Sequence, residues 1–201
     1  MPNEAYPSQL EAKEVKIIEL GFEKGELKTI GGKSFASGPA TIQALEKIAS
    51  KYAIGRDIHV GDTIIGIKGR VGFEAAAPLI IIKAHHLLEK HTLTKWQAYW
   101  KEQLANWYGM FLHEAMYHEP VMRNIETFLE ATQENVSGKV FVKLTPYRFE
   151  IQGIESKHDL MKSGFGEYGE TVKAWKADDV KGFTKILSNS LKIYNSVNKK
   201  I

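Results

Sequence analysis

Alternating apolar and polar residues predict a pair of antiparallel strands near the start of the chain. The alternation covers residues 15–20 and again residues 27–30, and successive side chains of a strand point to opposite faces. The glycine-bearing segment 21–26 predicts the turn between the two strands. Gly31 and Gly32 end the second strand, because glycine suits a tight turn.

Apolar residues spaced three or four apart predict helices through the middle of the chain. This spacing covers residues 39–53 and residues 78–91. Thr94 and Gln97 form a capping-box pattern that opens a long third helix. Pro120 suits the first position of a fourth helix.

The third predicted helix carries a stripe of large aromatic residues. Trp96, Trp100, Trp107 and Phe111 recur along it at helical spacing. Such a stripe is far more often part of a packed core than of a cofactor site, so we expect it to be buried.

A second hairpin and a closing helix complete the pattern. Apolar residues alternate over residues 140–144 and 149–151, with a turn predicted at Thr145–Tyr147, and residues 153–177 are irregular. A helix follows from about Asp178, and its apolar stripe comprises Phe183, Ile186, Leu187, Leu191, Tyr194 and Val197. We therefore predict an α+β fold with β-hairpins at both ends of a helical middle. The apolar stripe of the C-terminal amphipathic helix would be buried either against its own domain or between subunits.

Residues 55–74, GRDIHVGDTIIGIKGRVGFE, form the most unusual segment of the chain. Five glycines lie in twenty residues, although glycine weakens a strand unless a turn, a bulge or a close approach requires it. Gly61 and Asp62 lie between two β-branched runs, so they predict a hairpin with a two-residue Gly-Asp turn.

The strand after this turn would carry two different faces. One parity places apolar residues together, namely Ile65, Ile67, Val71 and Phe73. The opposite parity gathers charge, namely Lys68, Arg70 and Glu74. These charges would either grip a zwitterionic or anionic ligand or form a solvated ion-pair ladder, which contributes only about 0–1 kcal/mol per exposed pair.

Composition narrows the functional classes. The chain has 201 residues, 43% of them hydrophobic, which is enough for a packed core. Its 27 basic and 24 acidic residues give a net charge of +3 and no basic cluster, so we expect no nucleic-acid partner. Cysteine is absent, and neither a membrane-length apolar run nor a secretory start is present. We expect a cytoplasmic protein that does not bind a membrane.

Several motifs suggest chemistry but do not match its geometry. His113 and His118 lie five residues apart, about 140° around a helix, whereas the zinc-protease helix needs a spacing of four. The glycine-rich run 164–169 follows no clear strand and opens no helix, so it is a weak phosphate-binding candidate. Three further histidines are expected on helix surfaces or at helix caps: His85, His86 and His91.

In their order and spacing, these segments resemble the C-terminal half of argininosuccinate synthase. The resemblance runs from about residue 10 to the end, and it depends on the ordered set rather than on one motif. Its main blocks are Ile17–Gly25 with Gly31, Gly55–Arg56, Ile65–Lys68, Arg70–Glu74, Pro78, Ala84–His86, Leu88–Glu89, Leu93, Pro120, Gln133–Glu134, Gly138–Val140, Glu155–Ser156, Tyr168, Asp178 and Gly182–Phe183.

The resemblance implies ATP-dependent ligation of citrulline and aspartate. In that reaction ATP activates the ureido oxygen of citrulline as an adenylate, and the amine of aspartate displaces AMP to give argininosuccinate. ATP, with Mg as its counterion, would be bound mainly by an N-terminal nucleotide-binding domain that this chain lacks. We therefore expect the chain alone to be inactive. Family members are tetramers with interlocked C-terminal arms, so we expect a homo-oligomer, with a tetramer as the implied state.

The resemblance also implies which residues face citrulline. They are Gly61, Asp62, Lys68, Arg70, Phe73 and Glu74. Gly61 stands where the family commonly has a glutamate, and Phe73 stands where it has a tyrosine. Asp62 would either replace the glutamate or act only as a turn residue. The lost polarity leaves two alternatives open: a ligase acting on an N-acylated citrulline, or a non-catalytic oligomerisation or binding module of the same fold.

The predicted domain organisation follows. Residues 1–180 form a synthetase and multimerisation domain, in which the polar, proline-bearing residues 1–14 are a linker or an arm. Residues 181–201 form the C-terminal oligomerisation helix.

Overall fold

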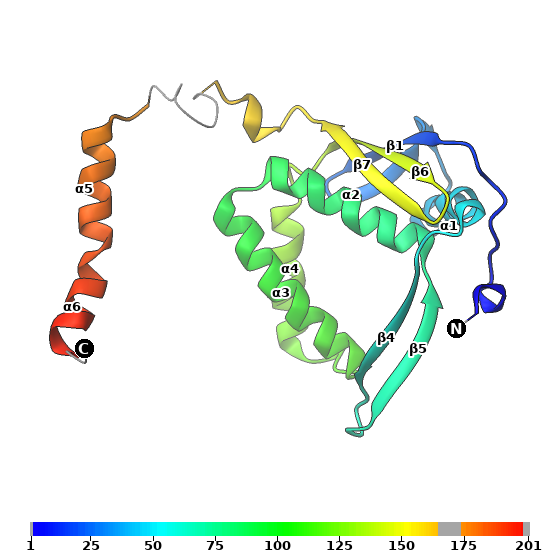
Figure 1. Cartoon of the computed structure of the whole chain (residues 1–201), viewed down its shortest axis with the longest axis horizontal. Coiled ribbons are helices and arrows are strands. Elements are labelled where there is room, and N and C mark those ends of the chain that lie inside the picture. The colour runs from blue at the N-terminus through cyan, green and yellow to red at the C-terminus, as the bar shows by residue number, and fades with distance from the viewer. Residues whose placement is uncertain (1, 165–173, 199–201) are drawn as a thin grey trace. The chain divides into compact units, whose positions relative to one another are not determined.

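The computed structural model describes residues 2–164 and 174–198. The chain folds as two compact units, residues 1–160 and residues 161–201 (Figure 1). Strands and helices alternate in the first unit and helices form the second, so the predicted α+β class is confirmed. Among the described residues, none of the helices is long and apolar enough to cross a membrane. The predicted boundary at residue 180 separates the synthetase and multimerisation domain from the oligomerisation helix, and it stays a prediction.

A five-stranded antiparallel sheet organises the first unit. Its strand order is β3-β2-β1-β6-β7, so the first and second hairpins lie side by side through the β1–β6 pair. The strands are β1 (Lys16–Glu23), β2 (Glu26–Ile30), β3 (Lys33–Ser34), β6 (Gly138–Thr145) and β7 (Arg148–Glu155). Both predicted hairpins are confirmed.

The first turn is shorter than the sequence pattern predicts. β1 continues through Glu23, and only Lys24 and Gly25, both with positive φ, connect it to β2. The prediction placed the turn at residues 21–26 because Gly21 was taken as a turn residue. Gly21 is instead a strand residue opposite Thr29, where a Cβ would lie 2.1 Å from the Thr29 hydroxyl oxygen. Its glycine therefore serves a close approach rather than a turn.

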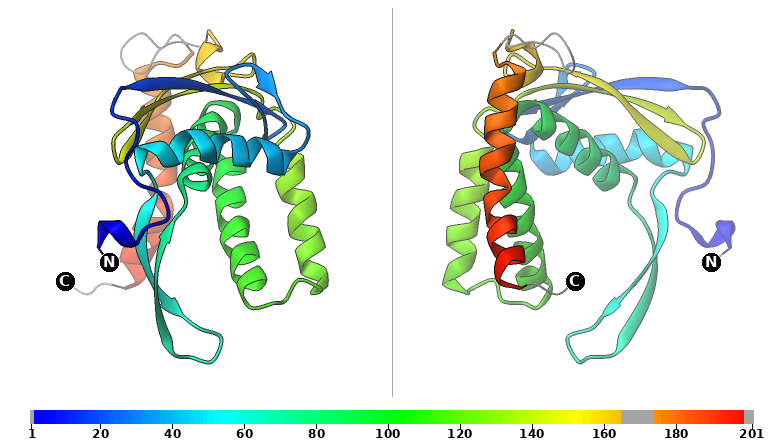
Figure 2. Two further views of the ribbon diagram at one scale, coloured as in Figure 1. Left: turned by 90° about the vertical axis from the view of Figure 1, so that its right-hand side faces the viewer. Right: turned by 60° about the vertical axis from the view of Figure 1, so that its left-hand side comes forward.

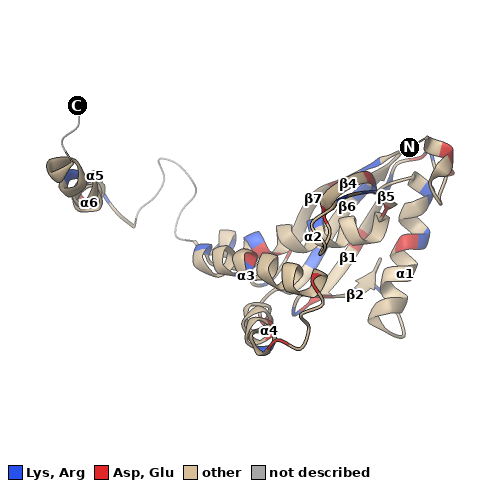
Figure 3. Cartoon of the chain, turned by 90° about the horizontal axis from the view of Figure 1, so that it is seen from below, with Lys and Arg blue, Asp and Glu red and all other residues tan. Residues whose placement is uncertain are grey.

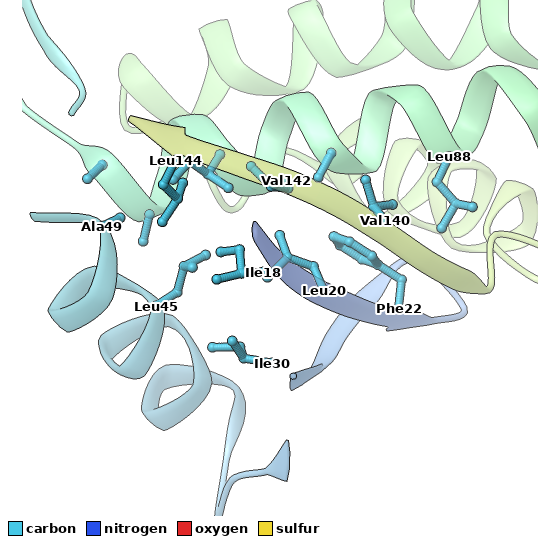
Figure 4. Packing of buried hydrophobic residues seen from close by; sticks show 14 of the residues in the cluster. Ile18, Leu20, Phe22, Ile30, Leu45, Ala49, Leu88, Val140, Val142 and Leu144 are labelled. Carbon is cyan, nitrogen blue, oxygen red and sulfur yellow. The ribbon is translucent and has the colours of Figure 1, made fainter. Parts of the chain in front are cut away.

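The hydrophobic core lies between one face of this sheet and two helices. α1 (Gly38–Ala49), followed by η2 (Ser50–Tyr52), and α2 (Ala76–Thr92) supply Leu45, Ile80 and Leu88 to it. Figure 4 shows Leu45 and Leu88 facing alternate residues of β1 and β6. The sheet residues are Ile18, Leu20, Phe22, Val140, Val142 and Leu144. The helices over residues 39–53 and 78–91 are confirmed as α1 with η2 and as α2.

Helices α3 (Lys95–His113) and α4 (Pro120–Thr132) form an antiparallel pair that lies side by side (Figure 2). The predicted capping box is present, because Thr94 accepts from the Gln97 N–H and Gln97 accepts from the Thr94 N–H. Both predicted helices are therefore confirmed.

The predicted burial of the aromatic stripe on α3 is wrong. Trp96, Trp100 and Trp107 are 63%, 54% and 54% exposed. The half-buried face of α3 includes Phe111, the fourth residue of the stripe, together with Lys101, which binds Glu89, and Tyr108, which donates to Glu126 at 2.8 Å. Periodicity identifies an apolar face of a helix but does not show that a neighbouring element covers it.

The second unit contains a short helix pair. The predicted single C-terminal helix is instead two helices, α5 (Ala177–Leu187) and α6 (Asn189–Val197), separated at Ser188. The Ser188 hydroxyl donates to the Lys185 carbonyl, and such side-chain bonds to the backbone compete with helix continuation. The predicted stripe is exposed along both helices. η3 (Leu160–Lys162) precedes this pair, and most of the glycine-rich run 164–169 lies outside the described residues.

Candidate functional site

The residues singled out by the sequence lie on a hairpin that extends away from the main sheet (Figures 1 and 2). β4 (Arg56–Asp62) and β5 (Lys68–Glu74) form a separate two-stranded antiparallel sheet. Its register is uninterrupted from the Arg56–Glu74 pair at the base to the Asp62–Lys68 pair at the tip. The predicted hairpin is therefore confirmed.

The turn of this hairpin is not where the sequence pattern placed it. Gly61 and Asp62 are the last residues of β4, so the predicted Gly-Asp turn is wrong. The chain turns over residues 63–67, where the Thr63 N–H donates to the Ile67 carbonyl at 3.0 Å and Gly66 adopts a φ of +78°. Gly66 provides the left-handed conformation that longer hairpin loops require.

The shifted turn also changes the predicted faces. Ile65 and Ile67 belong to the turn and are exposed, so they do not extend the apolar face of the strand as predicted. Lys68, Arg70 and Glu74 do share a face of β5, since they alternate in an uninterrupted register. This part of the prediction holds.

The six predicted site residues occupy different levels of the hairpin. At the tip, the Lys68 ammonium lies 2.7 Å from a carboxylate oxygen of Asp62, and both side chains are exposed. Arg70 lies in the middle, opposite Val60, and Gly61 lies opposite Gly69 on the other face. The structure therefore brings the tip residues together.

Phe73 and Glu74 lie at the base of the hairpin. Six residues separate Lys68 from Glu74, which is about 20 Å along a strand. Glu74 is directed at Arg56, and the Glu74 Oε2 to Arg56 Nε distance is 3.4 Å. Phe73 lies opposite Asp57, on the face away from Glu74. The six residues thus do not line one common cavity.

Sequence reasoning missed a buried polar cluster beside the core. Glu89 of α2 is 7% exposed at its side chain and binds the Lys101 ammonium of α3 at 2.9 Å. Its other oxygen accepts from the Gln133 amide at 2.9 Å, just after α4. Three helices are therefore joined through one carboxylate. The available signal was a glutamate directly beside a core leucine, Leu88, and one helical turn after His85.

His85 belongs to the same cluster. Its Nε2 lies 2.8 Å from Gln133 Oε1, and its ring packs against Phe22. His85 is therefore half-buried rather than on the helix surface as expected, because Gln133 and Phe22 pack against its ring. Burial lowers the pKa of His85 below the ordinary value of 6.5, although the Glu89 carboxylate opposes that shift.

A cavity of about 510 Å³ opens beside this cluster, between α2, α3 and β7. Basic and acidic side chains both line it, including Lys83, Lys90 and Glu102. Figure 3 shows the same mixture along α1 and α3, where the two signs are interspersed. This mixed charge does not single out one class of ligand.

Binding of ATP phosphates in the first unit would depend on the backbone N–H groups at its helix N-termini. A phosphate is bound at a helix N-terminus through free backbone N–H groups. α1 and α2 each follow a strand, but the Ser37 hydroxyl accepts from the Ala40 N–H at the start of α1. The Glu46 carboxylate accepts from the Ala77 N–H at the start of α2. One backbone N–H at the start of each of these two helices is therefore already bound by a side chain.

The fold and this hairpin define an α+β domain that combines a one-sided antiparallel sheet with a projecting, charge-tipped β-hairpin. A family model for the argininosuccinate synthase C-terminal domain matches residues 3–194. The chain therefore belongs to the argininosuccinate synthase C-terminal domain family, and the resemblance seen in the sequence is confirmed.

Curated relatives named argininosuccinate synthase support the same assignment. The relative from Xylella fastidiosa is 33% identical over 184 residues, which cover 92% of this chain and 45% of the relative. The relative from Dictyoglomus turgidum is 36% identical over 180 residues, which cover 89% of this chain and 45% of the relative. The chain thus spans about half the length of the curated relatives it matches.

Proposed function

We propose that this chain is the C-terminal half of an ATP-dependent carbon–nitrogen ligase that joins citrulline and aspartate. The products would be argininosuccinate, AMP and pyrophosphate, as part of arginine biosynthesis. Membership of the argininosuccinate synthase C-terminal domain family supports this proposal. The observation that carries it is the projecting β4–β5 hairpin with the charged pair Asp62 and Lys68 at its tip.

ATP and its Mg would be bound mainly by the half that this chain does not span. The starts of α1 and α2 agree with this division, because Ser37 and Glu46 each already bind one of the N–H groups there. On this proposal the present chain contributes the citrulline side of the site and no catalytic group, and alone it has no ligase activity.

Of the six residues that the resemblance implies, we assign the citrulline side to those at and beside the tip of the hairpin. Asp62 is the central one, because its carboxylate would bind the α-ammonium group of citrulline. It would first have to release Lys68, and an exposed ion pair contributes only about 0–1 kcal/mol. A hydrogen bond to a charged group contributes about 1.5–3 kcal/mol, which favours the exchange. Gly61, Lys68 and Arg70 lie beside it, whereas Phe73 and Glu74 lie at the base, about 20 Å along the strand, and would not reach the same citrulline.

Replacing Asp62 with asparagine tests this assignment in the complete enzyme. The change removes the charge but keeps a residue of the same shape, so we expect the KM for citrulline to rise about tenfold or more. Asp57→Asn is the matched control, since it removes the same charge from the base of the same hairpin, where Asp57 accepts from the Ile58 N–H. Equal citrulline KM values for the two variants would contradict the proposal.

A second candidate function follows from Gly61 and Phe73, which lack the polar groups that the resemblance implies. An N-acylated citrulline has no α-ammonium group and would need less polarity at this end of the site. A ligase for that substrate would turn over N-acetylcitrulline faster than citrulline, and Asp62→Asn would leave its KM unchanged. A non-catalytic module of the same fold would turn over neither compound.

We also propose that α5 and α6 join subunits of a homo-oligomer, with a tetramer as the expected state. Their exposed apolar stripe supports this, because a helix with one apolar face is stabilised by burying it. This part of the proposal covers the C-terminal oligomerisation arm over residues 181–201.

A further inference from the structure

The base of the β4–β5 hairpin is held by the N-terminal arm of the chain. The arm runs from η1 (Asn3–Ala5) to residue 14, and most of its side chains are exposed. Tyr6 is the exception, since it is buried against the hairpin base. Its ring lies 4.7 Å from the centre of the Arg56 guanidinium group. A cation over an aromatic face at this distance is attracted by the ring.

Arg56 closes a ring of polar contacts around this point. Its Nη2 donates to the Ser8 carbonyl, and the Ser8 hydroxyl donates to Glu74. Arg56 Nε lies 3.4 Å from Glu74 Oε2, and the two side chains are only 11% and 5% exposed. Within the described chain neither of these two atoms makes a hydrogen bond. A buried charge without its partner is costly, so each charge depends on the other.

A third part of the fold meets the same guanidinium group. The ring of Tyr147, in the turn between β6 and β7, lies 6.0 Å from Arg56. The Tyr147 N–H donates to the Tyr52 carbonyl at 2.7 Å, which ties this turn to the end of η2. Arg56 therefore contacts the arm, the hairpin and the main sheet at one place.

Contacts at the base determine where the tip of the hairpin lies. β4 and β5 pair with each other in a separate two-stranded sheet, and such a hairpin is marginally stable alone. The tip is about 20 Å from the base, so a rotation of about 10° at the base moves the tip by about 3.5 Å. That displacement is as long as a hydrogen bond.

We propose that Arg56 is a positioning residue that clasps the N-terminal arm to the hairpin base and thereby directs the hairpin tip. Tyr6, Ser8 and Glu74 complete this clasp. The functional importance of the clasp rests on the proposed function, because the tip presents Asp62 to citrulline. The clasp itself is a property of the fold and can be tested without catalysis.

Arg56→Lys tests the clasp in this chain, because lysine keeps the charge but lacks the planar guanidinium group that stacks on Tyr6 and reaches Ser8 and Glu74 through separate nitrogens. Amide hydrogen exchange, followed by mass spectrometry, should become about tenfold faster in peptides from the arm and from residues 56–74. Peptides from β1 and β6 should keep their exchange rates, which a general loss of stability would not allow. Lys13→Ala, an exposed change in the same arm, is the control and should alter neither region.

Tyr6→Leu provides a second test, since it keeps an apolar residue and removes only the aromatic face. It should speed exchange in the hairpin about threefold, although Tyr6 is not part of the hairpin. Faster exchange in the arm with an unchanged hairpin, in both variants, would overturn the proposal. Failure of the proposed function would appear separately, as an unchanged citrulline KM in Asp62→Asn while the exchange results stand.

Discussion

Replacing Glu89 with alanine should loosen the attachment of α3 and α4 to α2. The carboxylate of Glu89 binds Lys101 of α3 and Gln133 after α4, both at 2.9 Å. Without it, the Lys101 ammonium, whose side chain is only 15% exposed, loses its carboxylate. The Gln133 amide keeps a contact with the Thr132 hydroxyl at 3.0 Å. The substitution therefore leaves one poorly solvated charge and one weakened amide.

The size of the effect follows from this geometry. Breaking a buried ion pair by removing one partner costs roughly 3–5 kcal/mol. Lys101 is partly exposed and can turn towards water, so we expect the lower end, about 3 kcal/mol, for Glu89→Ala. Glu89→Met combined with Lys101→Met removes both charges and keeps the volume. That double variant should lie within about 1 kcal/mol of the unchanged chain.

Urea unfolding followed by circular dichroism measures these differences through the midpoint and the slope. Glu102→Ala is the control, because Glu102 is the exposed neighbour of Lys101 and should shift the free energy of unfolding by no more than about 0.5 kcal/mol. If Glu89→Ala behaves like Glu102→Ala, the cluster does not attach α3. If the double variant is less stable than Glu89→Ala, the asymmetry expected of a buried pair is wrong.

Three further predictions concern stability and assembly. Because burial lowers the pKa of His85 below 6.5, the unfolded chain binds the proton first as the pH falls. Urea midpoints should therefore drop between about pH 7.5 and about pH 5.5, and less in His85→Gln; equal slopes would contradict this. Leu20→Ala in the core should cost about 2–5 kcal/mol by the same assay, whereas Ile17→Ala on the exposed face should cost no more than about 0.5 kcal/mol. Truncation after Gly182 should lower the number of subunits per particle in light scattering, and an unchanged number would exclude the removed part of α5 and all of α6 from the subunit interface.

The elements that the sequence predicted well are those whose evidence is local. The alternation over β1, β6 and β7 and the capping box of α3 each lie within a few residues, and the structure confirms them. The position of the β4–β5 turn was harder to predict, because the segment has glycines at both position 61 and position 66, and either could form a turn. Only Gly66 has the positive φ that the turn uses.

The contacts that sequence reasoning missed join distant parts of the chain. Arg56 meets Tyr6 and Ser8, about fifty residues earlier, and periodicity does not report such pairs. The exposure of Trp100 has the same cause, since an apolar stripe shows which face of α3 is apolar and not what covers it. The citrulline assignment of Asp62 came from the family resemblance and stays a prediction.

The two buried ion pairs have a common place in this fold. The sheet is joined to α1 and α2 by apolar packing, and each projecting part has a pair of opposite charges where it leaves the core, beside apolar contacts such as that of Ala98 in α3. Arg56 and Glu74 lie at the base of the hairpin, and Lys101 and Glu89 lie where α3 meets α2. A buried ion pair adds little net stability compared with apolar residues of the same size. Its two charges compensate each other in only a narrow range of relative positions, however. We infer that these pairs determine the direction of the projections rather than the stability of the core. On that account, apolar replacement of a whole pair should preserve folding and change the placement of the projecting part.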